Sequence, residues 1–429
     1  MQSLLHDTCA GVVGLRPMRV RGEVLARGSI GFERSEDSMP QPATPASKHH
    51  DSVAGPSIAW LAAGFLLAGL GTVMLGPIMP TLLHDWRLTD QQGGLLLAAK
   101  FVGSFLGGVS VPRRLRLGVL GGMAFACAGF GAFALSGGLL SGAACLFVSG
   151  FGLGQIIAST NIVVGRRYRE HTGSALASVN FFWSLGAVAC GVIAAAVLPR
   201  FHLRGPLLMF AGLFLVTGAG GLLSPSRRAS AASEIAPADA ARLPTHTLIR
   251  FTILLFLYGG LETCMTGWLT TYTLRFSDVR LMGGQSAIVL LWSALTAGRA
   301  LSSAALRVMR EATMQRIGLG LSAVLIAALV TTRHGPLLSL YCVLLGLSLA
   351  PFFPTTFALL MKQRPTAREA GFVLAVSGLG AALFPWMMGF VSTESGSLRI
   401  AMAVPMALAL ALLGLSVMTK RAEPETLAV

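Results

Sequence analysis

The chain has 429 residues, of which 54% are hydrophobic and 12% charged, whereas a soluble domain carries about 25% charged residues. This composition excludes a large soluble domain and is typical of a protein embedded in lipid. The formal net charge of +15 does not indicate nucleic-acid binding, because the basic residues form brief clusters between apolar stretches rather than one basic face.

Residues 1–55 mix Arg, Ser, Pro and acidic residues without apolar periodicity. We expect a disordered cytoplasmic N-terminal tail here. The apolar patch Cys9–Leu15 is too short for a signal peptide. Met39 is an alternative start of translation, so that residues 1–38 would lie outside the mature protein.

Apolar stretches then recur along the chain, each about as long as the 20 residues that cross a bilayer core of about 30 Å. The sequence predicts twelve membrane helices, at 57–83, 91–112, 115–137, 139–164, 173–198, 204–224, 249–275, 283–306, 313–331, 335–361, 367–391 and 397–419. The polar segment between the sixth and seventh helices divides them evenly. The predicted organisation is a six-helix bundle over 56–224, a cytoplasmic linker over 225–248, a second bundle over 249–419 and a cytoplasmic tail over 420–429.

Basic residues are distributed unevenly between the two sets of alternate loops. Eighteen Lys and Arg residues, from Arg113 to Arg421, lie in one set and at the C-terminal end, against seven, from Arg87 to Arg399, in the other. The side rich in Lys and Arg faces the cytoplasm in membrane proteins. We therefore expect both termini in the cytoplasm and an integral protein of the bacterial inner membrane.

The two halves align with each other. Residues 65–76 match 256–267 without a gap, with Phe, Leu, Gly, Leu, Thr, Met and Gly in common. Leu185-Gly-Ala in the fifth helix matches Leu379-Gly-Ala in the eleventh. Parallel six-helix repeats with a solute site near the midplane between them are the architecture of secondary transporters. The sequence therefore indicates a membrane transporter.

Several of these segments resemble the fucose–galactose–glucose:proton symporter-like branch of the major facilitator superfamily. The motifs that carry the resemblance are 256–272 in the seventh helix, 346–355 in the tenth, 179–187 in the fifth and 296–299 in the eighth. The resemblance implies an all-α integral membrane fold with twelve transmembrane helices in two pseudo-symmetric six-helix bundles. It also implies sugar transport by symport with protons.

The chain departs from that superfamily at two places. The loop 107–114 keeps the basic pair Arg113 and Arg114 but lacks the usual acidic residue, so we expect these arginines to serve as an altered gating charge. The first helix has no carboxylate between Gly64 and Pro80, whereas fucose-type members place one there. The proton site of those members therefore cannot be transferred to this helix.

Ionisable residues inside a membrane are costly and are functional candidates by default. Glu262 in the seventh helix is the candidate proton-coupling residue, because burial disfavours its ionised form. Lys100 in the second helix either pairs with Glu262 or extends to the outer surface. Arg299 lies about two turns from the cytoplasmic end of the eighth helix, where we expect it to brace helix ends. The alternative for Glu262 is a permanent structural pairing.

Neutral polar and aromatic residues complete the candidate substrate site, because sugars bind amides through hydroxyl groups and stack on flat rings. They are Gln155, Asn161, Asn180, Trp183, Trp268, Tyr272 and Trp292. We expect Asn180 and Trp268 to converge on the solute from opposite halves. Alternatively, Tyr272 and Trp292 face lipid or the membrane interface, and Asn161 caps backbone near a loop.

No nucleotide-binding, nucleophile-elbow or metal-ligand motif is present in the sequence, so no enzymatic activity, cofactor or metal is expected. The leading hypothesis is a monomeric transporter that moves a monosaccharide or similarly small polar solute together with protons. Two other hypotheses stay open: an efflux carrier for amphipathic compounds, with a cavity richer in Met and Phe, and a membrane sensor that transports nothing.

Overall fold

The computed structural model describes residues 56–168, 172–223, 242–278, 284–305, 309–363 and 365–421. The predicted N-terminal tail, most of the predicted linker and almost all of the C-terminal tail lie outside these ranges. All helices below belong to one structural unit, Val53–Val429.

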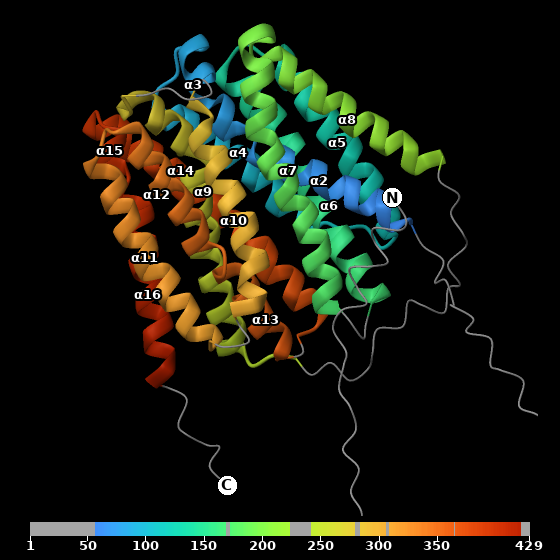
Figure 1. Cartoon of the computed structure of the whole chain (residues 1–429). Coiled ribbons are helices and arrows are strands. Elements are labelled where there is room, and N and C mark those ends of the chain that lie inside the picture. Colours follow the sequence, from blue (N-terminus) through green and yellow to red (C-terminus); the bar gives the residue numbers. More distant parts are fainter. Residues whose placement is uncertain are drawn as a thin grey trace, which may run out of the picture. The chain divides into compact units, whose positions relative to one another are not determined.

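Every element in the described residues is a helix (Figure 1). The helices are α2 (Ile58–Val73), α3 (Leu75–Asp85), α4 (Asp90–Val109), α5 (Leu115–Leu135), α6 (Leu139–Arg167), α7 (Thr172–Phe201), α8 (Arg204–Leu223), α9 (Thr245–Phe276), α10 (Ser286–Ala305), α11 (Glu311–Thr331), α12 (Gly335–Leu349), α13 (Phe352–Lys362), α14 (Ala367–Ser395), α15 (Leu398–Ala401) and α16 (Ala403–Arg421). The predicted all-α fold is confirmed.

The predicted spans coincide with these helices to within a few residues at most ends. Eleven spans of the described residues are long and apolar enough to cross a membrane, and α10 contains a shorter apolar stretch, Ser286–Ser302. Side chains fix several helix starts. Thr89 caps α4 and Thr366 caps α14, each exchanging hydrogen bonds with the residue three positions on.

Successive helices cross between two ends of the bundle, which we name by residues they carry. At the Asp90 face, α3 ends, α4 begins, and α9 and α14 end. At the linker face, α8 ends and α9 begins. Figure 1 shows α3 and α15 together at the Asp90 face and the end of α16 at the opposite one.

The first and tenth spans are each broken, which the sequence analysis does not predict. Proline lacks an N–H and disrupts the helical ladder one turn back. Pro77 follows the break at Met74 between α2 and α3, and Pro351 stands at the break between α12 and α13. Side chains from elsewhere in the bundle donate to carbonyl oxygens near the first break: the Lys100 ammonium binds Thr72 O, and Gln285 Nε2 binds Pro77 O at 2.8 Å.

Glycines at matching repeat positions bring helices into backbone contact. A Cβ at Gly186 of α7 would overlap Leu66 O of α2, and a Cβ at Gly380 of α14 would overlap Phe256 O of α9. Close approach of this kind requires small residues in membrane helices. The fifth helix therefore packs on the first as the eleventh packs on the seventh, which agrees with the internal repeat of the sequence.

Helices of the first six spans contact those of the last six mainly along three seams. These seams are α3 with α9, α4 with α14, and α7 with α10. At the first seam, Gly76 lies against the backbone of Thr266, and at the second, Gly94 lies against the backbone of Trp386. The candidate site lies beside the third seam.

Candidate functional site

A charged cluster ties the two halves together at the Asp90 face. Asp90 of α4 accepts two hydrogen bonds from Arg275 of α9, at 2.6 and 2.7 Å, and one from Ser392 Oγ of α14, at 2.5 Å. The Asp90 side chain is 10% exposed and that of Arg275 40%. Bidentate pairing of arginine with a carboxylate is the strongest form of this interaction, so this face is closed by a specific contact.

Trp268 packs into the same closure. Its indole N–H donates to Pro385 O of α14 at 2.9 Å, and its ring lies against Gly93 of α4 and Gly389 of α14. The side chain is fully buried. Trp268 therefore fills the α4–α9–α14 junction below Asp90.

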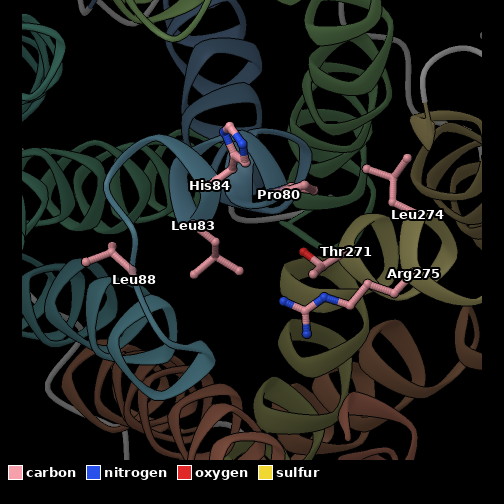
Figure 2. Close-up of a pocket in the computed structure, with 7 residues that line it drawn as sticks. All are labelled: Pro80, Leu83, His84, Leu88, Thr271, Leu274 and Arg275. Carbon is pink, nitrogen blue, oxygen red and sulfur yellow. The ribbon is translucent and has the colours of Figure 1, made fainter. Parts of the chain in front are cut away.

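A cavity of about 360 Å³ opens beside this cluster, between α3 and α9 (Figure 2). Its lining residues are Pro80, Leu83, His84, Leu88, Thr271, Leu274 and Arg275. None of the predicted site residues lines it. We interpret it as a vestibule on the closed face.

Deeper in the bundle, Glu262 of α9 and Arg299 of α10 form an ion pair. Arg299 Nη2 lies 3.3 Å from Glu262 Oε1, and the two side chains are 17% and 16% exposed. Arg299 Nη1 also donates to Ser184 Oγ of α7 at 2.8 Å. The arginine therefore connects the acid of the second half to a helix of the first half.

Aromatic rings surround the guanidinium. Its central carbon lies 6.0 Å from the ring centroids of both Trp183 and Trp292 and 5.8 Å from that of Phe353. The two indoles meet edge to face across the α7–α10 seam, 5.3 Å apart. Cations are attracted to ring faces at such distances, so the rings help to hold Arg299 in place.

Several buried polar atoms on the two helices that carry the pair lack a hydrogen-bond partner among the described residues. On α10 they are Trp292 Nε1, Thr296 Oγ1 and Arg299 Nε, and on α9 they include Thr266 Oγ1 and Thr270 Oγ1. Residues 292, 296 and 299 share one face of α10, because their spacing follows the helical period. A buried polar group without a partner is unfavourable, and such a cluster is typical of a ligand site.

The structure therefore brings four of the predicted site residues together: Glu262, Arg299, Trp183 and Trp292. Lys100 takes neither of its two predicted positions. It is 1% exposed, and its ammonium binds the backbone at Thr72 and lies 4.7 Å from the Phe101 ring. Lys100 thus binds a backbone carbonyl next to the break in the first span.

The remaining predicted residues lie elsewhere. Asn180 donates its amide to Leu176 O of its own helix at 2.8 Å, and Tyr272 donates its hydroxyl to Leu329 O at 3.2 Å. Both Tyr272 and Trp292 are buried, so neither faces lipid. Gln155 is buried and Asn161 half-buried on α6, while Arg113 and Arg114 are exposed before α5.

Sequence reasoning missed the polar residues of the seams, namely Asp90, Ser184, Arg275, Gln285, Thr296 and Ser392. Asp90 and Arg275 stand at helix ends in the sequence, where charges are ordinary. Only the packing of α4 on α9 makes them partners.

The fold and this partly buried polar site between two helical halves define an integral membrane transporter. The chain belongs to the major facilitator superfamily, whose family model matches residues 61–376. Among curated proteins, none is significantly similar to this chain.

Solved structures with the same fold cover most of the chain at low sequence identity. One is a bacterial homologue of the human lysosomal transporter Spinster in an inward-facing, occupied conformation, with 11% identity, a TM-score of 0.67, and coverage of 85% of this chain and 96% of that one. Another is the E. coli fucose:proton symporter, with 15% identity, a TM-score of 0.59, and coverage of 84% and 97%. A third is a human organic anion transporter, with 18% identity, a TM-score of 0.61, and coverage of 83% and 98%.

Proposed function

We propose that this protein is a secondary active transporter for a monosaccharide or a similarly small polar solute. The observation that carries the proposal is the Glu262–Arg299 pair, which lies beside the α7–α10 seam and next to two indole rings that touch each other. Rocking of one half against the other would expose this site to each side of the membrane in turn.

The chemistry of the site suits a hydroxylated solute. Trp183 and Trp292 offer flat apolar faces, while the ion pair and the unpartnered Trp292 and Thr296 groups offer hydrogen bonds. An amphipathic drug would require a larger apolar lining, whereas Phe353 is the one phenylalanine of the described residues whose ring lies within about 6 Å of the Arg299 guanidinium. The similarity to the E. coli fucose:proton symporter supports the same solute class.

Glu262 is the proposed proton-coupling residue. Protonation would remove the negative charge that holds Arg299 Nη2, while Arg299 Nη1 still binds Ser184 across the seam. The proton would thereby change a contact that links the two halves. Proton binding at Glu262 would in this way be coupled to the relative movement of the two halves.

The basic loops at the linker face support an orientation with both termini in the cytoplasm. In that orientation, the closed Asp90 face is the outer one, and the protein lies in the bacterial inner membrane with its outer side shut.

The test is transport by purified full-length protein in proteoliposomes with an imposed pH gradient. The labelled solutes are galactose, fucose and galacturonate, so that neutral and acidic sugars are both covered. We expect accumulation of at least one solute by the parent. Glu262→Gln should keep exchange of that solute but lose accumulation.

Glu394→Gln is the matched control, because Glu394 is exposed at the end of α14. It should accumulate the solute as the parent does. No transport of any of the three solutes by the parent would contradict the proposed solute class, and full accumulation by Glu262→Gln would contradict the role of Glu262.

A further inference from the structure

The Glu262–Arg299 pair uses only part of the guanidinium. The edge of an arginine that carries Nε and Nη2 presents two parallel N–H groups, which suit the two oxygens of one carboxylate. Glu262 makes a single contact of 3.3 Å to Nη2, one of the two nitrogens of this edge, and the other, Nε, has no partner among the described residues. One of the two nitrogens of this edge therefore has a partner, and the other has none among the described residues.

A second arginine–carboxylate pair in the described residues provides a comparison. Arg275 holds Asp90 through two contacts of 2.6 and 2.7 Å, and Ser392 adds a third donor. Asp90 is thus held by three short hydrogen bonds. Arg299 holds Glu262 by one longer contact of 3.3 Å, so separating Glu262 from Arg299 breaks fewer hydrogen bonds than separating Asp90 from Arg275 does.

Further donors point to the same kind of ligand. Trp292 Nε1 can only donate a hydrogen bond, and Thr296 Oγ1 can donate one. Both are buried and lack partners among the described residues, and both lie on the α10 face that carries Arg299. The unused groups of α10 therefore require an acceptor, and the richest small acceptor is an anion.

The local charge permits an anion only if Glu262 becomes neutral. The helices packed against α9 include α3, α10, α13, α14 and α16. Among their described titratable groups and those of α9 itself, Arg299 and Tyr258 are the ones that interact with Glu262. One arginine and one ionised glutamate sum to zero. A bound anion restores zero when Glu262 holds a proton.

We propose that the transported solute is a sugar acid or similarly small hydroxylated carboxylate, whose carboxylate replaces that of Glu262 on Arg299 while Glu262 is protonated. This inference rests on the proposed function and narrows its solute class. Arg299 binds one carboxylate at a time. One proton therefore enters the site with each anion, and the two leave together.

The experiment measures binding to the purified full-length protein by isothermal titration calorimetry. The probes are galacturonate and galactose, which differ only in a carboxylate against a hydroxymethyl group. We expect galacturonate to bind at least about tenfold more tightly than galactose at about pH 5.5, because it completes a charged bidentate contact. Its affinity should fall as pH rises, since the bound state holds one more proton than the free state.

Three variants sharpen the test. Glu262→Gln mimics the protonated acid, so it should bind galacturonate with an affinity that does not change between about pH 5.5 and pH 8. Trp292→Phe and Thr296→Val each remove one donor and keep most of the shape, so each should weaken galacturonate binding by about tenfold. The Thr331→Val variant is the control for loss of a hydroxyl, because Thr331 is exposed and bonds only its own helix.

The outcomes separate the two proposals. Galactose bound as tightly as galacturonate, with no pH dependence, would overturn the inference while the proposed function stands. Galacturonate binding that stays pH-dependent in Glu262→Gln would also overturn it. If the parent neither binds nor transports galacturonate or galactose, the inference and the proposed function are overturned together.

Discussion

Asp90 and Arg275 form a bidentate ion pair that joins α4 of the first half to α9 of the second, with N–O distances of 2.6 and 2.7 Å. Ser392 of α14 donates to the same carboxylate, and the backbone N–H of Gln91 donates to Thr393 Oγ1 nearby. This cluster is the most complete polar contact between the halves in the described residues. It is expected to set how readily the Asp90 face opens.

Removal of the Asp90 charge should therefore favour opening of this face. Asp90→Asn loses a charged pair that is only partly exposed to solvent, which should weaken the closure by about 1–3 kcal/mol. A cysteine at position 271, buried in the vestibule wall, would report the change in a background without native cysteines. We expect its labelling by a thiol reagent to rise about tenfold or more.

Asp85→Asn is the control for that experiment. Asp85 lies at the same face but bonds only the exposed His84. Labelling at position 271 should stay at the parent rate in this variant. An equal rate in Asp90→Asn would mean that the ion pair does not limit opening.

The orientation of the chain is a second prediction. A cysteine introduced at position 232, in the predicted cytoplasmic linker, should resist a membrane-impermeant thiol reagent in intact cells. A cysteine at Gly138, which has open space around it at the Asp90 face, should be labelled rapidly. The reverse pattern would invert the proposed topology.

The repeat-related glycines yield a stability prediction. Gly186→Ala and Gly380→Ala each place a methyl group against a backbone carbonyl of the neighbouring helix. Relief of this overlap requires movement of a helix, so each variant should lose about 1–3 kcal/mol of stability. Gly220→Ala and Gly414→Ala are matched controls, because nothing lies near those positions. In thermal denaturation in detergent, the first two variants should melt at lower temperatures than the two controls. Equal melting temperatures for all four would contradict the close helix packing at Gly186 and Gly380.

Trp183 and Trp268, both of the predicted substrate set, should behave differently. Trp183 lies beside Arg299, so Trp183→Phe should weaken solute binding by about three- to tenfold through its smaller face. Trp268 is buried against Pro385, so Trp268→Phe should lower thermal stability and leave affinity within about twofold. Binding and melting measurements on both variants check this. A large loss of affinity in Trp268→Phe would restore Trp268 to the substrate site.

Much of the fold could be predicted from the sequence, because membrane helices need long apolar stretches and the halves repeat. The helix breaks were missed, although Pro77-x-x-Pro80 and Pro351-x-x-Pro354 are the signal for them within apolar spans. Those prolines remove backbone donors in the middle of a helix. Attention to that loss would have predicted both irregular segments.

The candidate site was predicted less well, since its partners depend on helix rotation. Glu262 and Arg299 are visible in the sequence as charges inside lipid. Their pairing depends on which faces α9 and α10 turn toward each other, and no local pattern encodes this. Lys100 shows the same limit, because its partner is a backbone carbonyl near the break in another helix.

The bond between Lys100 and Thr72 also bears on how the chain enters the membrane. A lysine at the centre of a helix costs about 2.5–3.5 kcal/mol during insertion, and α4 carries one with no acid beside it in the described residues. The carbonyl that receives its ammonium belongs to the preceding span, which is synthesised first. We therefore expect α4 to insert poorly as a single segment and well as a hairpin with α2 and α3. Glycosylation-mapping of the two segments in microsomes would show the difference, and the first break in the bundle would then assist the biogenesis of the second helix.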